Sequence, residues 1–354
     1  MNRNKNLDYL RGISAFGIML YHYSSWMFGK YSSEDFFGRV GIYGVSLFYI
    51  LSGLTLFCVY NDKLTLEKWN ILDFFKKRIL RIFPLLWLAT LISVFVYHFN
   101  RFDNLNLALN LSGLFGLFNW DKYYAVGAWS IGNEMVFYIC FPFLVYFTKH
   151  SKITFLLISL FIAILFLFFT FNILNAERPL SEQWRNYVNP LNQLYLFYAG
   201  ILIGKFVKNV SFSTLTIRLI FVVGLLIFIF FPVTGNTINL ITGINRIVFS
   251  ISCVLLCFSF FKLNITLPSY LEFSLTQLGH ISYSVYLLHP ILFHFLHPYL
   301  KSILPYSTFS HYIIFSLMIL TTIISSYFVY EYFEKTFIRF GHGKTPVLLK
   351  NYKG

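Results

Sequence analysis

The sequence predicts an all-α, polytopic integral membrane protein with about ten transmembrane helices and cytoplasmic N- and C-termini. Of its 354 residues, 57% are hydrophobic and only 12% are charged, a composition far from that of a soluble domain. Runs of about 20 apolar residues recur along the chain, as membrane-spanning helices require. The N-terminal MNRNKNLDYLRG leads into such a run without a small-residue cleavage site, so we expect the first helix to stay attached.

The flanking polar residues set the limits of the predicted spans. These are residues 7–27, 38–60, 79–99, 128–148, 153–174, 190–208, 213–233, 243–261, 280–300 and 309–333. The longest connections, residues 61–78 and 262–279 inside and 100–127 and 175–189 outside, are too short for separate cores. We therefore predict one membrane domain, residues 1–340, and a short cytoplasmic tail, residues 341–354.

The distribution of lysine and arginine predicts the orientation. With the N-terminus inside, most of the basic residues behind the net charge of +14 fall on cytoplasmic segments. The opposite side holds few, such as Lys30, Arg39, Arg101, Lys122, Arg178 and Arg185. This is the positive-inside bias, so the basic charge indicates topology and attraction to anionic lipid, and no nucleic-acid partner is needed to explain it.

Arg11 and His22 lie eleven residues apart on the first predicted span. In a helix this spacing puts both side chains on one face, about 16 Å apart along the axis. Arg11 is then near the membrane surface and His22 near the midplane. An ionisable residue inside the membrane is costly to bury, so His22 is a functional-site candidate.

A basic cluster opens the third span, in the sequence FFKKRILRIFPLLW. Lys76, Lys77, Arg78 and Arg81 all precede Pro84, and the two arginines share one helix face. Ordinary anchoring at the cytoplasmic surface explains this cluster, and so does a phosphate-rich ligand that arrives from the cytoplasm.

The fourth span opens with the polar sequence WSIGNE. Ser130 and Asn133 precede Glu134, which is expected roughly 9 Å below the outer surface. A carboxylate at this depth needs a partner or it becomes protonated. His22 or an arginine at similar depth is the candidate partner.

Two further spans carry polar or small residues. Gly41, Gly44, Ser46, Ser52 and Gly53 in the second span indicate either close helix packing or a substrate-lining surface. The ninth span contains Ser282, Tyr283, Ser284, Tyr286 and His289 before Pro290. These residues either line a polar path or serve helix packing.

Metal chemistry has little support. Cys58, Cys140, Cys253 and Cys257 lie in apolar spans without metal-ligand spacing and are expected to be buried hydrophobic residues. His289, His294 and His297 share a helix without an acidic or sulfur ligand. We expect no metal.

Six ordered segments together resemble the membrane acyltransferase family 3. They are Arg11-x10-His22, GVSLFYILSG, KKRILRIFPLLW, WSIGNEMVFY, LGHISYSVYLLHP and YEYFEKTFIRFG, and the resemblance extends from about residue 5 to residue 340. It implies a ten-helix enzyme of the bacterial cytoplasmic (inner) membrane. Such enzymes transfer an acyl group, most often acetyl from acetyl-coenzyme A, to a hydroxyl of a surface polysaccharide or its undecaprenyl-linked precursor.

The resemblance also suggests details of the acceptor and of the chain's organisation. O-antigen lipopolysaccharide, capsule and exopolysaccharide are all possible acceptors. Because Met135 replaces a second glutamate, the chain looks closest to stand-alone exopolysaccharide-type members. We expect it to act without the fused extracellular domain that many relatives carry.

The predicted site residues take roles in this scheme. The donor head would rest among Arg11, Lys77, Arg78 and Arg81, and the acceptor near Trp129, Ser130, Asn133, Tyr283 and His289. His22 would act as a general base, or would itself be acylated, with Glu134 orienting its imidazole. Arg11 would assist at the same site.

The rival hypothesis is a proton-coupled transporter or flippase of a lipid-linked saccharide. In that case His22, Glu134 and His289 form a proton relay, and the arginines bind a diphosphate headgroup. The chain shows no internal repeat, which counts against a transporter. A structural or adhesion protein has no use for titratable residues at the midplane.

Overall fold

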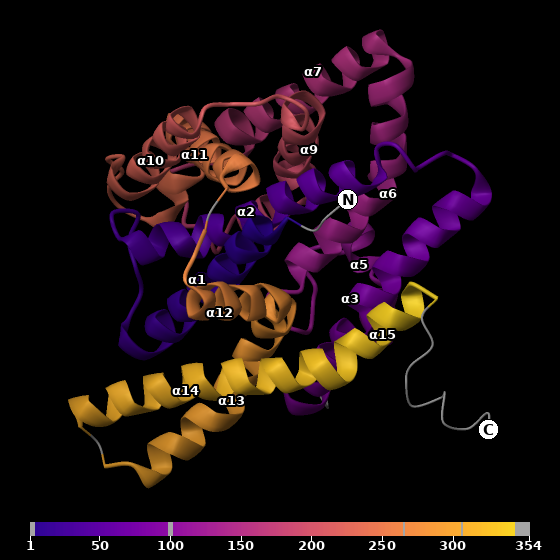
Figure 1. The fold of residues 1–354 in the computed structure, drawn as a ribbon. Coiled ribbons are helices and arrows are strands. Elements are labelled where there is room, and N and C mark those ends of the chain that lie inside the picture. The colour runs from indigo at the N-terminus through magenta and orange to yellow at the C-terminus, as the bar shows by residue number, and fades with distance from the viewer. Residues whose placement is uncertain (1–3, 98–101, 265, 306, 344–354) are drawn as a thin grey trace, which may run out of the picture. The chain divides into compact units, whose positions relative to one another are not determined.

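The computed structural model describes residues 4–97, 102–264, 266–305 and 307–343, and most of these residues are helical, with no β-strand among them (Figure 1). The chain forms two compact units. The first comprises Met1–Lys63 and Phe143–Ser282, and the second comprises Leu64–Pro142 and Tyr283–Gly354. Each unit is thus built from two separate stretches of the chain.

The first unit contains most of the helices. They are α1 (Lys5–Phe28), α2 (Phe36–Tyr60), α7 (Lys152–Phe168), α8 (Trp184–Tyr187), α9 (Pro190–Val207), α10 (Thr214–Phe230), α11 (Gly243–Lys262) and α12 (Ser269–His280), with a π-helix η1 (Phe169–Ile173) and a 3₁₀-helix η2 (Thr237–Leu240). The N-cap of α1 is Asn4, whose side chain accepts a hydrogen bond from the Asn6 backbone at 3.1 Å.

The second unit contains α3 (Lys68–Tyr97), α4 (Asn104–Ser112), α5 (Phe115–Phe118), α14 (Thr308–Phe328), the π-helix η3 (Val329–Glu334) and α15 (Lys335–Gly341), together with nearly all of α13 (Ser282–Ile303). Helix α6 (Trp129–His150) begins in this unit and ends in the first. Figure 1 shows α14 continuing through η3 into α15.

Within the described residues, each of the ten predicted spans coincides with a helix, while residues 98 and 99 of the third span lie outside them. Among the described residues, six helices are long and apolar enough to cross a membrane: Phe36–Tyr60, Lys68–Val96, Trp129–His150, Lys152–Ile173, Gly243–Lys262 and Thr308–Gly341. These six helices fit a multi-pass membrane protein. The other four predicted spans correspond to α1, α9, α13 and the shorter α10. Polar side chains interrupt the first three of these, so the count of ten and the orientation stay predictions.

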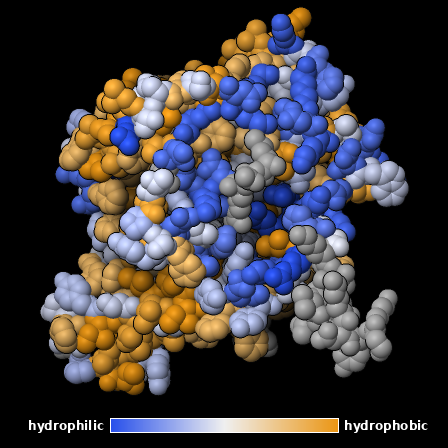
Figure 2. All heavy atoms as spheres, viewed as in Figure 1, coloured by the Kyte–Doolittle hydropathy of each residue, from blue (hydrophilic) through white to orange (hydrophobic). Residues whose placement is uncertain are grey.

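The outer surfaces of several helices are apolar, as contact with lipid requires. Hydrophobic side chains cover α10 and α14 in Figure 2. On α7 the exposed hydrophobic residues include Ile153, Leu156, Leu157, Leu160, Phe161 and Ile164. A helix that is hydrophobic on its exposed face is stable there only when lipid or protein covers it.

Glycines set the packing of α2. A Cβ atom on Gly53 would lie 1.9 Å from the Phe197 carbonyl oxygen of α9, and one on Gly200 would lie 2.0 Å from the Ile50 oxygen. On the α1 side, a Cβ on Gly44 would lie 2.5 Å from Ile18. Side chains larger than hydrogen do not fit at these contacts. Of the two interpretations of these glycines, close helix packing is therefore the one that the structure supports.

Helix α12 lies in the predicted 262–279 connection and packs against α1. Gly12 and Gly279 face each other there, since a Cβ on Gly12 would lie 2.7 Å from the Gly279 nitrogen. The Asp8 carbonyl oxygen would lie 2.4 Å from a Cβ on Gly279. This close contact fixes the turn of α1 that carries Asp8 and Arg11.

Candidate active site

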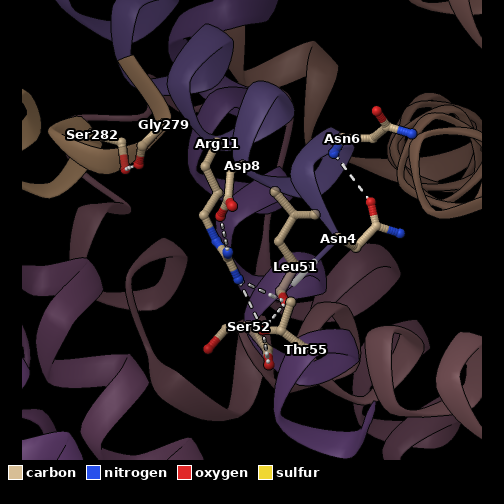
Figure 3. A network of polar contacts seen from close by, with 9 residues as sticks. All are labelled: Asn4, Asn6, Asp8, Arg11, Leu51, Ser52, Thr55, Gly279 and Ser282. Carbon is tan, nitrogen blue, oxygen red and sulfur yellow. Dashed lines mark hydrogen bonds and ion pairs between the residues drawn. The ribbon is translucent and has the colours of Figure 1, made fainter. Parts of the chain in front are cut away.

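The Arg11 side chain is held by groups from two helices of the first unit (Figure 3). Its Nη1 donates to Asp8 at 3.1 Å, and its Nη2 donates to the Thr55 hydroxyl at 2.8 Å and the Leu51 carbonyl at 3.4 Å. Thr55 in turn donates to the Leu51 oxygen at 2.7 Å. These contacts give the guanidinium a defined direction.

Asp8 is the acidic partner of Arg11 and is 3% exposed. It lies three residues before Arg11 and so shares a helix face with it. The sequence analysis missed Asp8, although a carboxylate at that spacing before an intramembrane arginine is a visible signal. It also missed Thr55, because no sequence pattern links positions 44 residues apart.

His22 lies on the same helix as Arg11. Helix α1 runs without interruption from Lys5 to Phe28, so the two residues have the common face and the rise of about 16 Å that their spacing predicts. The imidazole stacks on Trp26, with 5.0 Å between ring centroids, and lies 5.1 Å from the Tyr21 ring. His22 is therefore set among aromatic rings and is partly buried.

The basic cluster is in the second unit, on α3. Lys77 forms an ion pair with Asp73 at 2.5 Å, one turn away. Arg78 is partly buried and Arg81 is exposed. Helix α15 packs along this part of α3, with Lys76 5.8 Å from the Phe340 ring centre and Gly341 beside Leu80. Of the three predicted donor-binding cations on α3, Arg81 is thus the most accessible.

Four predicted residues lie together on the first turns of α6. Trp129, Ser130 and Asn133 are buried, and Glu134 is partly exposed. The Ser130 hydroxyl donates to the Tyr286 oxygen of α13 at 2.9 Å, and Tyr286 donates to the Gly127 carbonyl at 2.9 Å. Gly127 has φ +86°, a conformation that favours glycine. These bonds hold the start of α6 against α13.

Tyr283 lies near several charged side chains of the second unit. Its hydroxyl donates to the Ile82 carbonyl of α3 at 2.8 Å, and it interacts electrostatically with Glu334, Glu134 and Arg81. Groups from α3, α6, α13 and η3 therefore surround one phenol.

Glu334 is the residue of this cluster that the sequence analysis missed. It is 4% exposed, accepts a hydrogen bond from the Ser284 hydroxyl and interacts with Arg81. It ends the π-helix η3, a feature that is frequent at functional sites. The signal in the sequence is an acidic residue directly after the closing apolar span, within the segment YEYFEKTFIRFG.

His289 lies on α13, 1% exposed, with Nδ1 2.9 Å from the Val285 carbonyl oxygen. This contact indicates that Nδ1 carries the proton. Its ring lies 6.2 Å from that of Tyr286. His289 is thus a buried residue that packs near Tyr286.

The predicted site residues therefore fall into two groups. Arg11 and His22 belong to the first unit, and the predicted residues of α3, α6 and α13 belong to the second. Among the described residues, no three histidine, cysteine or acidic side chains come together in a way that could hold a metal ion.

Comparison with known proteins adds to this geometry. A family model described as an acyltransferase domain matches residues 4–330. Similar curated proteins include the O-acetyltransferase OatA of Staphylococcus aureus strains COL and MRSA252, each 26% identical over 161 residues. That match covers 41% of this chain and 25% of the relative's length. No solved structure matches. Since the family model covers nearly the whole chain, this protein belongs to the membrane acyltransferase family 3.

Proposed function

We propose that the protein is a membrane O-acetyltransferase of the bacterial cytoplasmic membrane. It takes acetyl from cytoplasmic acetyl-coenzyme A and passes it to a sugar hydroxyl of a surface polysaccharide or its lipid-linked precursor. The observation that carries the proposal is the fixed Arg11 guanidinium on the same helix face as His22. A phosphate-binding cation and a titratable ring, separated by about 16 Å of helix, suit a donor with a phosphorylated head and a long arm.

Arg11 binds the donor head in this scheme. Its Asp8 and Thr55 partners leave the planar guanidinium oriented before the donor arrives, which lowers the cost of ordering it on binding. On α3, Arg78 and Arg81 carry guanidinium groups of the kind that suits phosphate, while Lys77 shares its ammonium with Asp73. The thioester then extends along α1 toward His22.

His22 removes the proton from the attacking sugar hydroxyl. The hydroxyl oxygen forms a bond to the acetyl carbonyl carbon, the carbon–sulfur bond breaks, and the proton passes from His22 to the departing thiolate. In a second version His22 is itself acetylated first and the sugar hydroxyl then takes the acetyl group from it.

A single reagent separates this function from transport. Membranes that contain the protein and a native saccharide acceptor are incubated with acetyl-coenzyme A labelled in the acetyl group. The proposal predicts base-labile label in the saccharide, because an O-acetyl ester is cleaved by base. A transporter or flippase moves its saccharide unmodified, so it leaves the acceptor unlabelled in the same membranes.

A further inference from the structure

A polar cavity of about 530 Å³ lies in the first unit, and neither Arg11 nor His22 lines it. It opens between the π-helix η1, which ends α7, and the start of α11. Its volume is within the range of about 300–1,000 Å³ that small-molecule sites occupy. The polar and aromatic side chains of its wall include those of Thr170, Phe171, Asn172, Asn239, Thr242 and Asn245.

Two of the amides are fixed by the backbone. Asn239 Nδ2 donates to the Thr234 carbonyl at 2.8 Å, and Asn245 Nδ2 donates to the Asn239 carbonyl at 2.9 Å. Each bond uses one amide hydrogen. The Oδ1 atom and the second hydrogen of each amide remain for a ligand, and an amide offers hydroxyl groups both a donor and an acceptor.

Phe171 supplies an apolar face beside these amides. Its side chain is 52% exposed although it lies at the end of an apolar helix. The π-helix η1 contains Thr170, Phe171 and Asn172, and local widening of this kind is frequent at functional sites. An exposed ring next to amides offers stacking and hydrogen bonds within one cavity.

The cavity is uncharged, since none of the described residues that line it is acidic or basic. The start of α11 adds backbone N–H groups without a helical partner. The Thr242 side chain makes no capping hydrogen bond to them, and its hydroxyl donates to the Ile238 carbonyl at 3.2 Å. Neutral donors and acceptors around a ring are suited to a hydroxyl-rich, uncharged ligand.

The opposite ends of the same helices carry lysines. Lys152 begins α7 and Lys262 ends α11, where Lys262 donates to the Lys208 carbonyl at 3.0 Å. Lys208 also pairs with Asp62 at 3.3 Å, and this hydrogen bond lowers the pKa of the exposed carboxyl. By the positive-inside rule the lysine end is cytoplasmic, so the cavity faces the outer side.

We propose that this cavity is a docking subsite for an uncharged saccharide, the acceptor chain, on the outer side of the membrane. As an acceptor subsite it rests on the proposed O-acetyltransferase function. As a saccharide-binding site it rests only on the residues that line the cavity. Phe171 stacks on a sugar ring while Asn239 and Asn245 bind its hydroxyls.

The test is direct binding by the full-length protein in detergent, without any acetyl donor. The probes are an immobilised panel of neutral and acidic bacterial oligosaccharides. The altered protein carries Phe171→Ala and Asn245→Ala. A matched control carries Phe161→Ala and Asn209→Ala, because Phe161 is 57% exposed on α7 and Asn209 is exposed at the lysine end.

We expect the wild type and the control to bind neutral oligosaccharides and the altered protein to bind them at least about tenfold more weakly. Equal binding by the altered protein, a preference for acidic probes, or no neutral probe bound by the wild type would overturn the proposal. The acetyl-transfer assay is separate, so saccharide binding without transfer refutes the enzyme and leaves the subsite. Acetyl transfer together with equal saccharide binding by the wild type and the altered protein refutes the subsite and leaves the enzyme.

Discussion

The Arg11 guanidinium of α1 donates a hydrogen bond to the Thr55 hydroxyl of α2 at 2.8 Å, across an interface that small residues keep close. Asp8 holds the other side of the same guanidinium. An arginine fixed from two helices keeps one orientation, which a flexible surface cation does not.

Loss of the Thr55 hydroxyl should weaken donor binding. In Thr55→Val the guanidinium loses one hydrogen bond of about 1 kcal/mol, so we expect the KM for acetyl-coenzyme A to rise about fivefold with little change in kcat. The control is Thr148→Val, since Thr148 is buried and its hydroxyl donates to the Val145 carbonyl of its own helix, whereas Thr55 is partly buried and contacts Arg11. Steady-state kinetics in membranes measures both, and an equal effect of the two changes would contradict the assigned role.

Removal of the Asp8 charge should destabilise the protein. Asp8→Asn leaves Arg11 without its acidic partner in a largely buried site, which we expect to cost about 2 kcal/mol or more. Asp73→Asn breaks the more exposed Asp73–Lys77 pair and should cost only about 0.3 to 0.5 kcal/mol. Thermal unfolding of the detergent-solubilised proteins compares them. Similar melting temperatures for the two variants would argue against a structural role of Asp8.

Packing of α2 against α9 should tolerate no side chain at Gly53. A Cβ there would meet a backbone carbonyl at 1.9 Å, so Gly53→Ala must push the helices apart, at an expected cost of about 1 to 3 kcal/mol. At Gly224 a Cβ would meet only side chains, the nearest at 3.2 Å. Gly224→Ala should therefore unfold at nearly the wild-type temperature, and unchanged stability of Gly53→Ala would refute this account.

The sequence predicted where the helices lie far better than how they are divided between the two compact units. Apolar runs bounded by polar residues placed a helix at each of the ten expected spans, because burial in lipid imposes a length on each run. The two π-helices, η1 and η3, left no such pattern. The division of the chain between two units depends on contacts between distant segments, which no local pattern encodes.

The sequence singles out residues of the candidate site by their chemistry and not by their partners. Arg11, His22 and Glu134 are candidates because ionisable side chains inside apolar runs are costly to bury. Asp8 is also an ionisable residue in such a run, and the sequence analysis did not include it among the site residues. Thr55 and Ser284 matter only through the partners that the fold gives them, Arg11 and Glu334. Ordinary hydroxyl residues in membrane helices offer no way to foresee this.

Glu334 should matter to the cluster around Tyr283. Glu334→Gln keeps the shape of the side chain but removes the charge that faces Arg81, so we expect acetyl transfer to fall about tenfold. Glu331→Gln is the control, because Glu331 is partly exposed and pairs with Lys335 at 2.7 Å. Transfer kinetics at equal protein levels gives the comparison. Equal activities would show that Glu334 only supports packing.

The most direct test of the central claim is acetyl transfer from labelled acetyl-coenzyme A by membranes containing the wild type, His22→Ala or His150→Ala at equal protein levels. His150 is an exposed histidine at the end of α6 and serves as the matched control. We predict that His22→Ala lowers labelling of the saccharide by about 10² to 10⁴, the usual contribution of a general base, while His150→Ala leaves it unchanged. Full labelling of the saccharide by His22→Ala would contradict the assignment of the chemistry to this residue.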